Sequence, residues 1–153
     1  MLNEGDPLPA VTLRDSNGDT LDLATLGGRP LVLYFYPKAD TPGCTNEAKD
    51  FSELLPDFDA LAAPVVGISK DAPKKLARFA EKYSLGVLLA SDEGGTVTED
   101  FGAWVEKSMY GRTYMGIDRA TFLFGTNGRL ERQWRKVKVK GHAAEVLAAA
   151  RAL

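Results

Sequence analysis

The sequence has a single cysteine and a single histidine among its 153 residues. One cysteine cannot form a disulfide within the chain, and it is too few for a cysteine-based zinc site. No apolar run approaches the length of a membrane-spanning helix. The formal net charge of −2 gives no reason to expect a nucleic-acid partner. We therefore expect a protein of the reducing cytoplasm that binds neither nucleic acid nor membrane.

The chain also lacks internal repeats, low-complexity tracts and linkers. Its amino terminus, MLNEGDPLP, is acidic and has no basic segment followed by an apolar one, so we expect no signal peptide. Apolar residues make up 44% of the sequence and charged residues 26%, which is an ordinary globular composition. A chain of this length can bury a substantial core, and we expect residues 1–153 to form one domain.

Six uninterrupted apolar residues, 31–36, predict a strand that is buried on both faces of a sheet. Pro37 has no N–H to offer a neighbouring strand and is expected to end it. A helix is predicted to begin after Thr41, which is a good N-cap, because Pro42 suits the first helical position and apolar residues then recur at helical spacing. The only cysteine, Cys44, therefore falls in the first turn of this helix.

The position of Cys44 has a chemical consequence. Free N–H groups and the positive end of the helix dipole favour an anion there, so the thiol is expected to ionise to the nucleophilic thiolate. We expect the side-chain oxygen of Thr41 to accept the backbone N–H of Cys44 and so to fix the loop. The alternative is a small, inert core residue, which most unpaired cysteines are. The capped, proline-flanked turn favours reactivity.

The rest of the chain alternates strand and helix patterns. Strands are expected at 11–14, 20–23, 65–69, 87–90, 120–124 and 130–139, and helices at about 73–83, 97–101 and 142–152. The first two strands predict an amino-terminal hairpin, and Thr-Asn-Gly at 126–128 predicts another. Pro56 is expected to kink or split the helix after Cys44. Residues 104–118 show no clean period and are predicted to form a long loop. The fold class is α/β, with a mixed central sheet flanked by helices.

The residues around Cys44, Pro37-Lys38-Ala39-Asp40-Thr41-Pro42-Gly43-Cys44-Thr45-Asn46-Glu47, resemble the active-site signature of the peroxiredoxins, Pro-x-x-x-Thr-x-x-Cys. The wording Asp-x-Pro-Gly-Cys-Thr is similar to the Q-type, or bacterioferritin-comigratory, branch. The likeness extends over essentially the whole chain, including YGRTYMGIDRATF and WRKVKVKGH. It implies a thioredoxin-like fold and a thiol-dependent peroxidase that reduces hydrogen peroxide and organic hydroperoxides through a cysteine sulfenic acid. It implies no metal, haem or flavin cofactor.

The resemblance makes Cys44 the nucleophile. Thr41 and Arg119 then activate the peroxide, and Pro37 shapes the pocket. A guanidinium at Arg119 would stabilise the thiolate and the leaving oxygen, whereas the residues alone suggest a solvated charge at a strand end. Glu47 lies one turn after Cys44, where its charge would oppose the thiolate unless an arginine offsets it. Glu47 is therefore either part of the catalytic site or a first-turn acid that complements the helix dipole.

Other candidate residues are interpreted as structural or left open. His142 is expected to be a structural residue at a helix start rather than a catalytic one. Lys136, Lys138 and Lys140 alternate with valines, which predicts the exposed face of a strand protected against edge pairing, with nucleic-acid binding a distant second. Aromatic and methionine residues of the predicted long loop either line a substrate mouth or plug the core: Trp104, Met109, Tyr110, Tyr114 and Met115.

The sequence departs from the Q-type pattern because it has no second, resolving cysteine. The two positions at which the branch carries one are Lys49 and Ala80 here. An external thiol, from a thioredoxin, a glutaredoxin or a small molecule, is then expected to reduce the sulfenic acid of Cys44. The alternative is a disulfide-linked dimer through Cys44, although the Q-type branch favours a monomer. Without either route, over-oxidation to the sulfinic acid is the risk.

Three other readings compete with a one-cysteine peroxidase. The chain can be a two-cysteine Q-type enzyme that has lost its resolving cysteine. A thiol–disulfide oxidoreductase normally has a Cys-x-x-Cys pair, and position 47 is glutamate here. A binding or chaperone-like module with an inert cysteine is the non-enzymatic reading. The reactivity of Cys44 separates the enzymes from the binding module, which an inert thiol with an ordinary pKa would favour.

Overall fold

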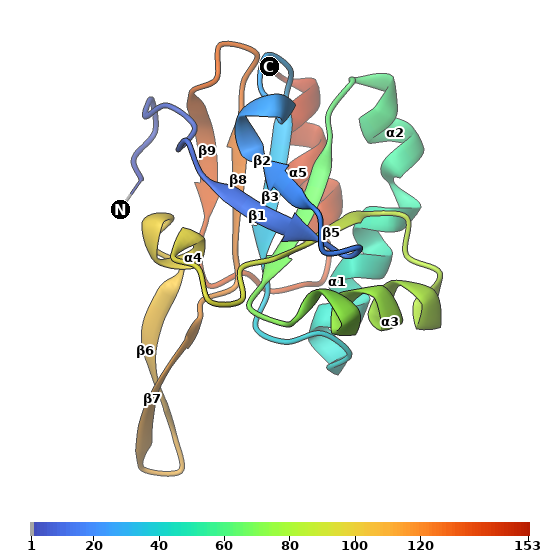
Figure 1. The fold of residues 1–153 in the computed structure, drawn as a ribbon. Coiled ribbons are helices and arrows are strands. Elements are labelled where there is room, and N and C mark those ends of the chain that lie inside the picture. The colour runs from blue at the N-terminus through green and yellow to red at the C-terminus, as the bar shows by residue number, and fades with distance from the viewer. Residues whose placement is uncertain (1) are drawn as a thin grey trace.

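The computed structural model describes residues 2–153 and contains a seven-stranded mixed sheet in the order β2-β1-β5-β4-β3-β8-β9 (Figure 1). The strands span β1 Thr12–Asp15, β2 Thr20–Asp22, β3 Leu31–Phe35, β4 Val65–Ser69, β5 Leu88–Ser91, β8 Ala120–Phe124 and β9 Leu130–Trp134. The central strands β3, β4 and β5 are parallel, and every other pairing in the sheet is antiparallel. The predicted α/β fold, the amino-terminal hairpin and the hairpin between β8 and β9 are all confirmed.

Strand β3 is buried on both faces, as its apolar run predicts. Because successive side chains of a strand point to opposite faces, Val32 and Tyr34 enter one core cluster while Leu33 and Phe35 enter another. The first cluster lies under helices and the second under the amino-terminal segment and α4 (Val97–Asp100). The strand that carries the chain toward Cys44 is thus the centre of both cores.

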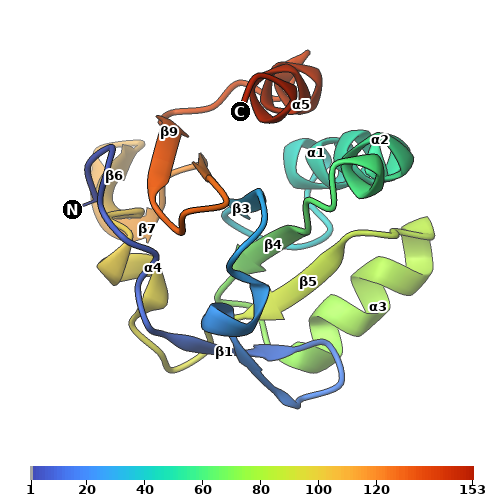
Figure 2. The ribbon, with the colours of Figure 1, turned by 90° about the horizontal axis from the view of Figure 1, so that it is seen from above.

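Helices cover the first of these faces: α1 Pro42–Glu53, α2 Leu55–Ala60, α3 Pro73–Tyr83 and α5 His142–Arg151. Figure 2 shows α1, α2 and α5 together over one part of the sheet, with α3 alongside β5. The helix after Cys44 divides at Leu54, which ends α1 and begins α2, so Pro56 splits the helix as predicted. A short 3-10 helix, η1 (Leu23–Leu26), follows β2.

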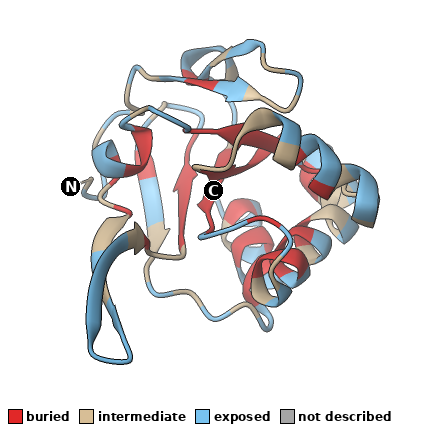
Figure 3. Ribbon diagram, turned by 60° about the horizontal axis from the view of Figure 1, so that its bottom comes forward, coloured by how far each residue is buried: buried red, intermediate tan, exposed pale blue. Residues whose placement is uncertain are grey.

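Residues 104–118 do not form the predicted loop. They form a two-stranded hairpin, β6 (Trp104–Met109) and β7 (Arg112–Ile117), that projects from the body of the molecule (Figure 1). Figure 3 shows most of this hairpin exposed, so neither face imposes the apolar alternation by which strands are identified in sequence. The turn has positive φ angles at Tyr110 and Gly111, which are typical of a tight hairpin turn.

The predicted strand 130–139 is too long, because β9 ends at Trp134. Lys136 adopts a positive φ of 47°, which takes the chain out of the extended conformation. The three lysines at 136, 138 and 140 are exposed as expected, but they lie on a connecting segment rather than on a strand. Edge protection is therefore not their role.

Candidate active site

Cys44 lies in the first turn of α1, directly beyond the carboxyl end of β3. Its side chain is only 2% exposed, and it is a free thiol. The loop that joins β3 to α1 delivers Cys44 from the most buried strand of the sheet to the helix N-terminus. The predicted arrangement of strand, loop and helix is therefore present, with the cysteine at its junction.

Arg119 reaches Cys44 from the start of β8. Ala120 pairs with Phe35 across the β3–β8 ladder, so Arg119 lies beside the point where β3 leaves the sheet. Its backbone carbonyl accepts the N–H of Val137, which holds the residue in place. The guanidinium donates from Nη2 to Cys44 Sγ at 3.3 Å. A donor in this position stabilises a thiolate.

The same guanidinium also binds Glu47. Its Nη1 atom donates to Oε1 of Glu47 at 2.6 Å, so one arginine bridges the sulfur and the carboxyl group. Gly43 leaves room for this bridge, because a Cβ atom there would lie 3.2 Å from Nη2 of Arg119. This long-range contact places the buried carboxyl group of Glu47 in one cluster with Arg119 and Cys44.

Burial determines which groups of the cluster carry a charge. It raises the pKa of Glu47 to about 7, and Arg119 only partly opposes that shift. Burial also works against the charge of Arg119, but Glu47 and Cys44 raise the pKa of the guanidinium above its ordinary value. Arg119 is therefore cationic, while Glu47 titrates near neutrality.

Thr41 does not cap α1 as predicted. It has the extended backbone of an N-cap residue, but its hydroxyl donates to the carbonyl of Lys38 at 2.8 Å and caps no helical N–H. The turn at Asp40, whose φ is 63°, folds the loop back so that this carbonyl is the available partner. The Thr41 oxygen keeps its lone pairs for another donor.

Two carboxylates fasten the loop: Asp71 from outside the signature and Asp40 from within it. Asp71, which follows β4, accepts the backbone N–H of Ala39 at 2.7 Å. Asp40 accepts from Tyr83 at 2.5 Å and from Lys82 at 2.9 Å, both on α3. The sequence interpretation missed Asp71, because its contact joins segments far apart in the chain and no local pattern signals it.

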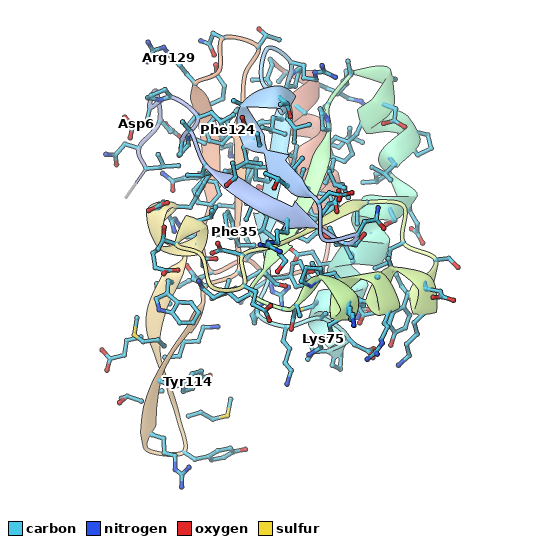
Figure 4. All side chains as sticks on the ribbon, in the orientation of Figure 1. Asp6, Phe35, Lys75, Tyr114, Phe124 and Arg129 are labelled. Carbon is cyan, nitrogen blue, oxygen red and sulfur yellow. The ribbon has the colours of Figure 1, made fainter. Side chains whose placement is uncertain are left out.

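Pro37 is exposed at the end of β3 and lines a groove of about 390 Å³ between the loop and the hairpin. Trp104, Tyr114 and Met115 line the opposite side. Tyr114 and Met115 are exposed, whereas Trp104 also packs against the second core cluster. Figure 4 labels Tyr114 on the projecting hairpin. Met109 and Tyr110 lie further out and are exposed.

His142 lies apart from this chemistry. Its ring is buried at the start of α5, and Nε2 is 2.8 Å from the hydroxyl of Thr121. Burial lowers the pKa of His142 to about 4, so the ring is neutral near pH 7. The geometry agrees with the structural role expected for it.

The positions that would hold a resolving cysteine are occupied differently. Lys49 is exposed on α1, and its ammonium lies 5.0 Å from the ring centre of Tyr83 on α3. Ala80 is half-buried on α3 and packs against the core. Within residues 2–153, no group of three metal-binding side chains is assembled, and no helix is long and apolar enough to cross a membrane.

Comparison with known proteins places this site in a family. The model of the AhpC/TSA family matches residues 5–133. Peroxiredoxin Bcp of Bacillus subtilis is 45% identical over 143 residues, which cover 94% of this chain and 91% of the relative. The solved structure of the Xanthomonas campestris bacterioferritin comigratory protein has a TM-score of 0.91 and 42% identity, covering 98% of both chains.

Two structures of Xanthomonas campestris peroxiredoxin Q bear on the missing cysteine. They have TM-scores of 0.91 and 0.90 and identities of 42% and 41%, and they cover 98% of this chain and 99% and 98% of their own. Each carries a serine in place of a different cysteine, and the two sites are separated along that chain by the same interval as Cys44 and Ala80 here. The expected thioredoxin-like fold is confirmed by these likenesses. The chain belongs to the AhpC/TSA family, as a Bcp or Q-type peroxiredoxin that lacks the resolving cysteine.

Proposed function

We propose that Cys44 is the peroxide-attacking residue of this thiol peroxidase and that Arg119 is the group that activates it. The observation that carries the proposal is the 3.3 Å contact between Nη2 of Arg119 and Sγ of Cys44, which is only 2% exposed. A guanidinium there stabilises the thiolate and then the negative charge that develops on the departing oxygen. Thr41 offers its hydroxyl oxygen to the peroxide, and Pro37 forms the wall of the entrance.

In this reaction the thiolate attacks one peroxide oxygen and the O–O bond breaks. Cys44 becomes a sulfenic acid, and the other oxygen leaves as hydroxide or alkoxide and takes up a proton to become water or an alcohol. Hydrogen peroxide and organic hydroperoxides both fit this step. The latter are supported by the groove beside Pro37 and by the alkyl peroxide reduction described for the Xanthomonas protein.

The thiol that closes the cycle comes from outside the chain, because position 49 is lysine and position 80 is alanine. It attacks the sulfenic sulfur, releases water and forms a mixed disulfide, which a second thiol reduces. We propose a small thiol, a glutaredoxin or a thioredoxin as its source and the cytoplasm as the compartment. The 2% exposure of Cys44 favours a monomer with a mixed disulfide over a dimer joined through Cys44.

Intact mass after addition of one equivalent of hydrogen peroxide tests the proposal, with a sulfenic-acid trap present. We expect rapid, stoichiometric trapping at Cys44 and none in a Cys44→Ser variant. Peroxide-dependent thiol oxidation should disappear in the same variant. Retained turnover by Cys44→Ser, or a wild-type thiol that is untouched after minutes, would refute the assignment.

A further inference from the structure

Glu47 is a buried acid, and the attack of the Cys44 thiolate on a peroxide does not by itself require one. Its side chain is 1% exposed, and its one hydrogen-bond partner among the described residues, Arg119, also contacts Cys44. Its second oxygen, Oε2, is buried and has no hydrogen-bond partner among the described residues. An ionised carboxylate would leave that charged oxygen without a donor, which is costly away from water.

The charged groups around Glu47 can balance only one negative charge in the cluster of Cys44, Glu47 and Arg119. Arg119 is the cation that acts on it. From α1, Asp50 raises the pKa of Glu47 further. From β3, burial raises the pKa of both Tyr34 and Tyr36, which are therefore neutral. His142, at the start of α5, is neutral as well, because burial lowers its pKa. A thiolate and a carboxylate together would exceed the one positive charge in a buried pocket.

We propose that Glu47 and Cys44 share one proton beside Arg119, so that Glu47 is protonated while the thiolate attacks and is ionised once the sulfenic acid has formed. This inference rests on the proposed role of Cys44. Before attack, Arg119 pairs with the thiolate and Glu47 is neutral. After attack the sulfur is neutral, and Arg119 pairs with the Glu47 carboxylate.

The step balances without a proton from solvent. The thiolate, the protonated carboxyl and the peroxide ROOH become the sulfenic acid, the carboxylate and the alcohol ROH. The sulfur loses two electrons, the O–O bond takes them, and the proton of Glu47 ends on the departing oxygen. Glu47 is thus a proton-holding group that keeps the pocket neutral on both sides of the reaction.

Proton uptake during a single oxidation tests the inference. A pH indicator in weakly buffered solution reports protons, and ultraviolet absorbance reports the thiolate that is lost. The pH is set below the value of about 7 to which burial raises the Glu47 pKa. We expect wild type to lose its thiolate with no net proton uptake. Glu47→Gln should take up one proton per thiolate, and Glu53→Gln, an exposed position on the same helix, should behave as wild type.

Uptake of one proton per thiolate by wild type would overturn the proposal, and so would the absence of thiolate from the reduced protein. A merely structural Glu47 gives that first result. If Glu47→Gln does not fold, the infrared difference between reduced and oxidised wild type decides instead. It should show loss of a protonated carboxyl band, which peroxide treatment of Cys44→Ser does not produce, and its absence would refute the sharing. Sulfenic-acid trapping in wild type monitors the role of Cys44 separately.

Discussion

At the scale of single residues, Arg119 is where the two halves of the site meet. Its two terminal nitrogens contact Cys44 and Glu47, two residues of α1 that are one turn apart. A planar fork of donors can hold both partners at once, whereas a lysine ammonium is a single point charge. The arginine therefore does more than supply positive charge.

Replacing Arg119 by lysine should keep the fold and slow the reaction of Cys44 with peroxide by about 10²- to 10³-fold, as for loss of one oxyanion donor. The lysine cannot reach the sulfur and the carboxyl together. Stopped-flow measurement of sulfenic-acid formation checks this, with the exposed Arg132→Lys as the matched control. A rate close to that of wild type would show that the forked contact is unimportant.

At the scale of elements, α5 is attached to β8 by a neutral histidine. A base whose pKa falls from 6.5 in the unfolded chain to about 4 in the fold binds fewer protons when folded. The folded protein is therefore stabilised above pH 6.5 relative to acid, and this contribution is lost as the pH falls toward 4. The position of His142 at a helix N-terminus, where a cation is unfavourable, acts in the same direction.

His142→Gln should remove this dependence. The wild type is expected to lose at most about 3 kcal/mol of unfolding free energy between those two pH values through this group, given 1.36 kcal/mol per pKa unit. Urea unfolding of both proteins at a series of pH values measures the difference. Parallel pH profiles for wild type and variant would contradict the assignment.

The projecting hairpin is the other element with a testable role. Tyr114 and Met115 line the groove that Pro37 borders, whereas Tyr110 is 97% exposed at the turn and lines none of it. A Tyr114→Ser, Met115→Ser variant should raise the KM for a bulky organic hydroperoxide several-fold and leave the KM for hydrogen peroxide unchanged. The reason is that about 25 cal/mol of binding free energy is lost for each Å² of apolar surface that the substrate no longer buries. Steady-state assays with both peroxides provide the measurement. Tyr110→Ser is the control, and an equal effect there would exclude the groove.

At the scale of the whole molecule, the absence of a second cysteine makes the enzyme sensitive to over-oxidation by its own substrate. Excess peroxide without a thiol should convert the sulfenic acid of Cys44 to the sulfinic acid. Burial of Cys44 at 2% exposure opposes a disulfide between two native chains. Intact mass and a non-reducing gel should therefore show oxygen addition in monomers. Added small thiol should prevent it, and predominant disulfide dimers would disprove the expectation.

The sequence by itself determined the strand, loop and helix around Cys44, because buried apolar runs, prolines and helical periodicity act locally. The hairpin 104–117 was not predicted, because a strand exposed on both faces has no periodic pattern of apolar residues. The prediction that Thr41 caps the helix was wrong, because the turn at Asp40 brings the carbonyl of Lys38 within reach of the Thr41 hydroxyl. Only the tertiary structure decided the rest. The sheet brings Arg119 to Cys44 and Asp71 to Ala39, and the packing of the fold buries Glu47. Those contacts join distant segments, and no local pattern encodes them.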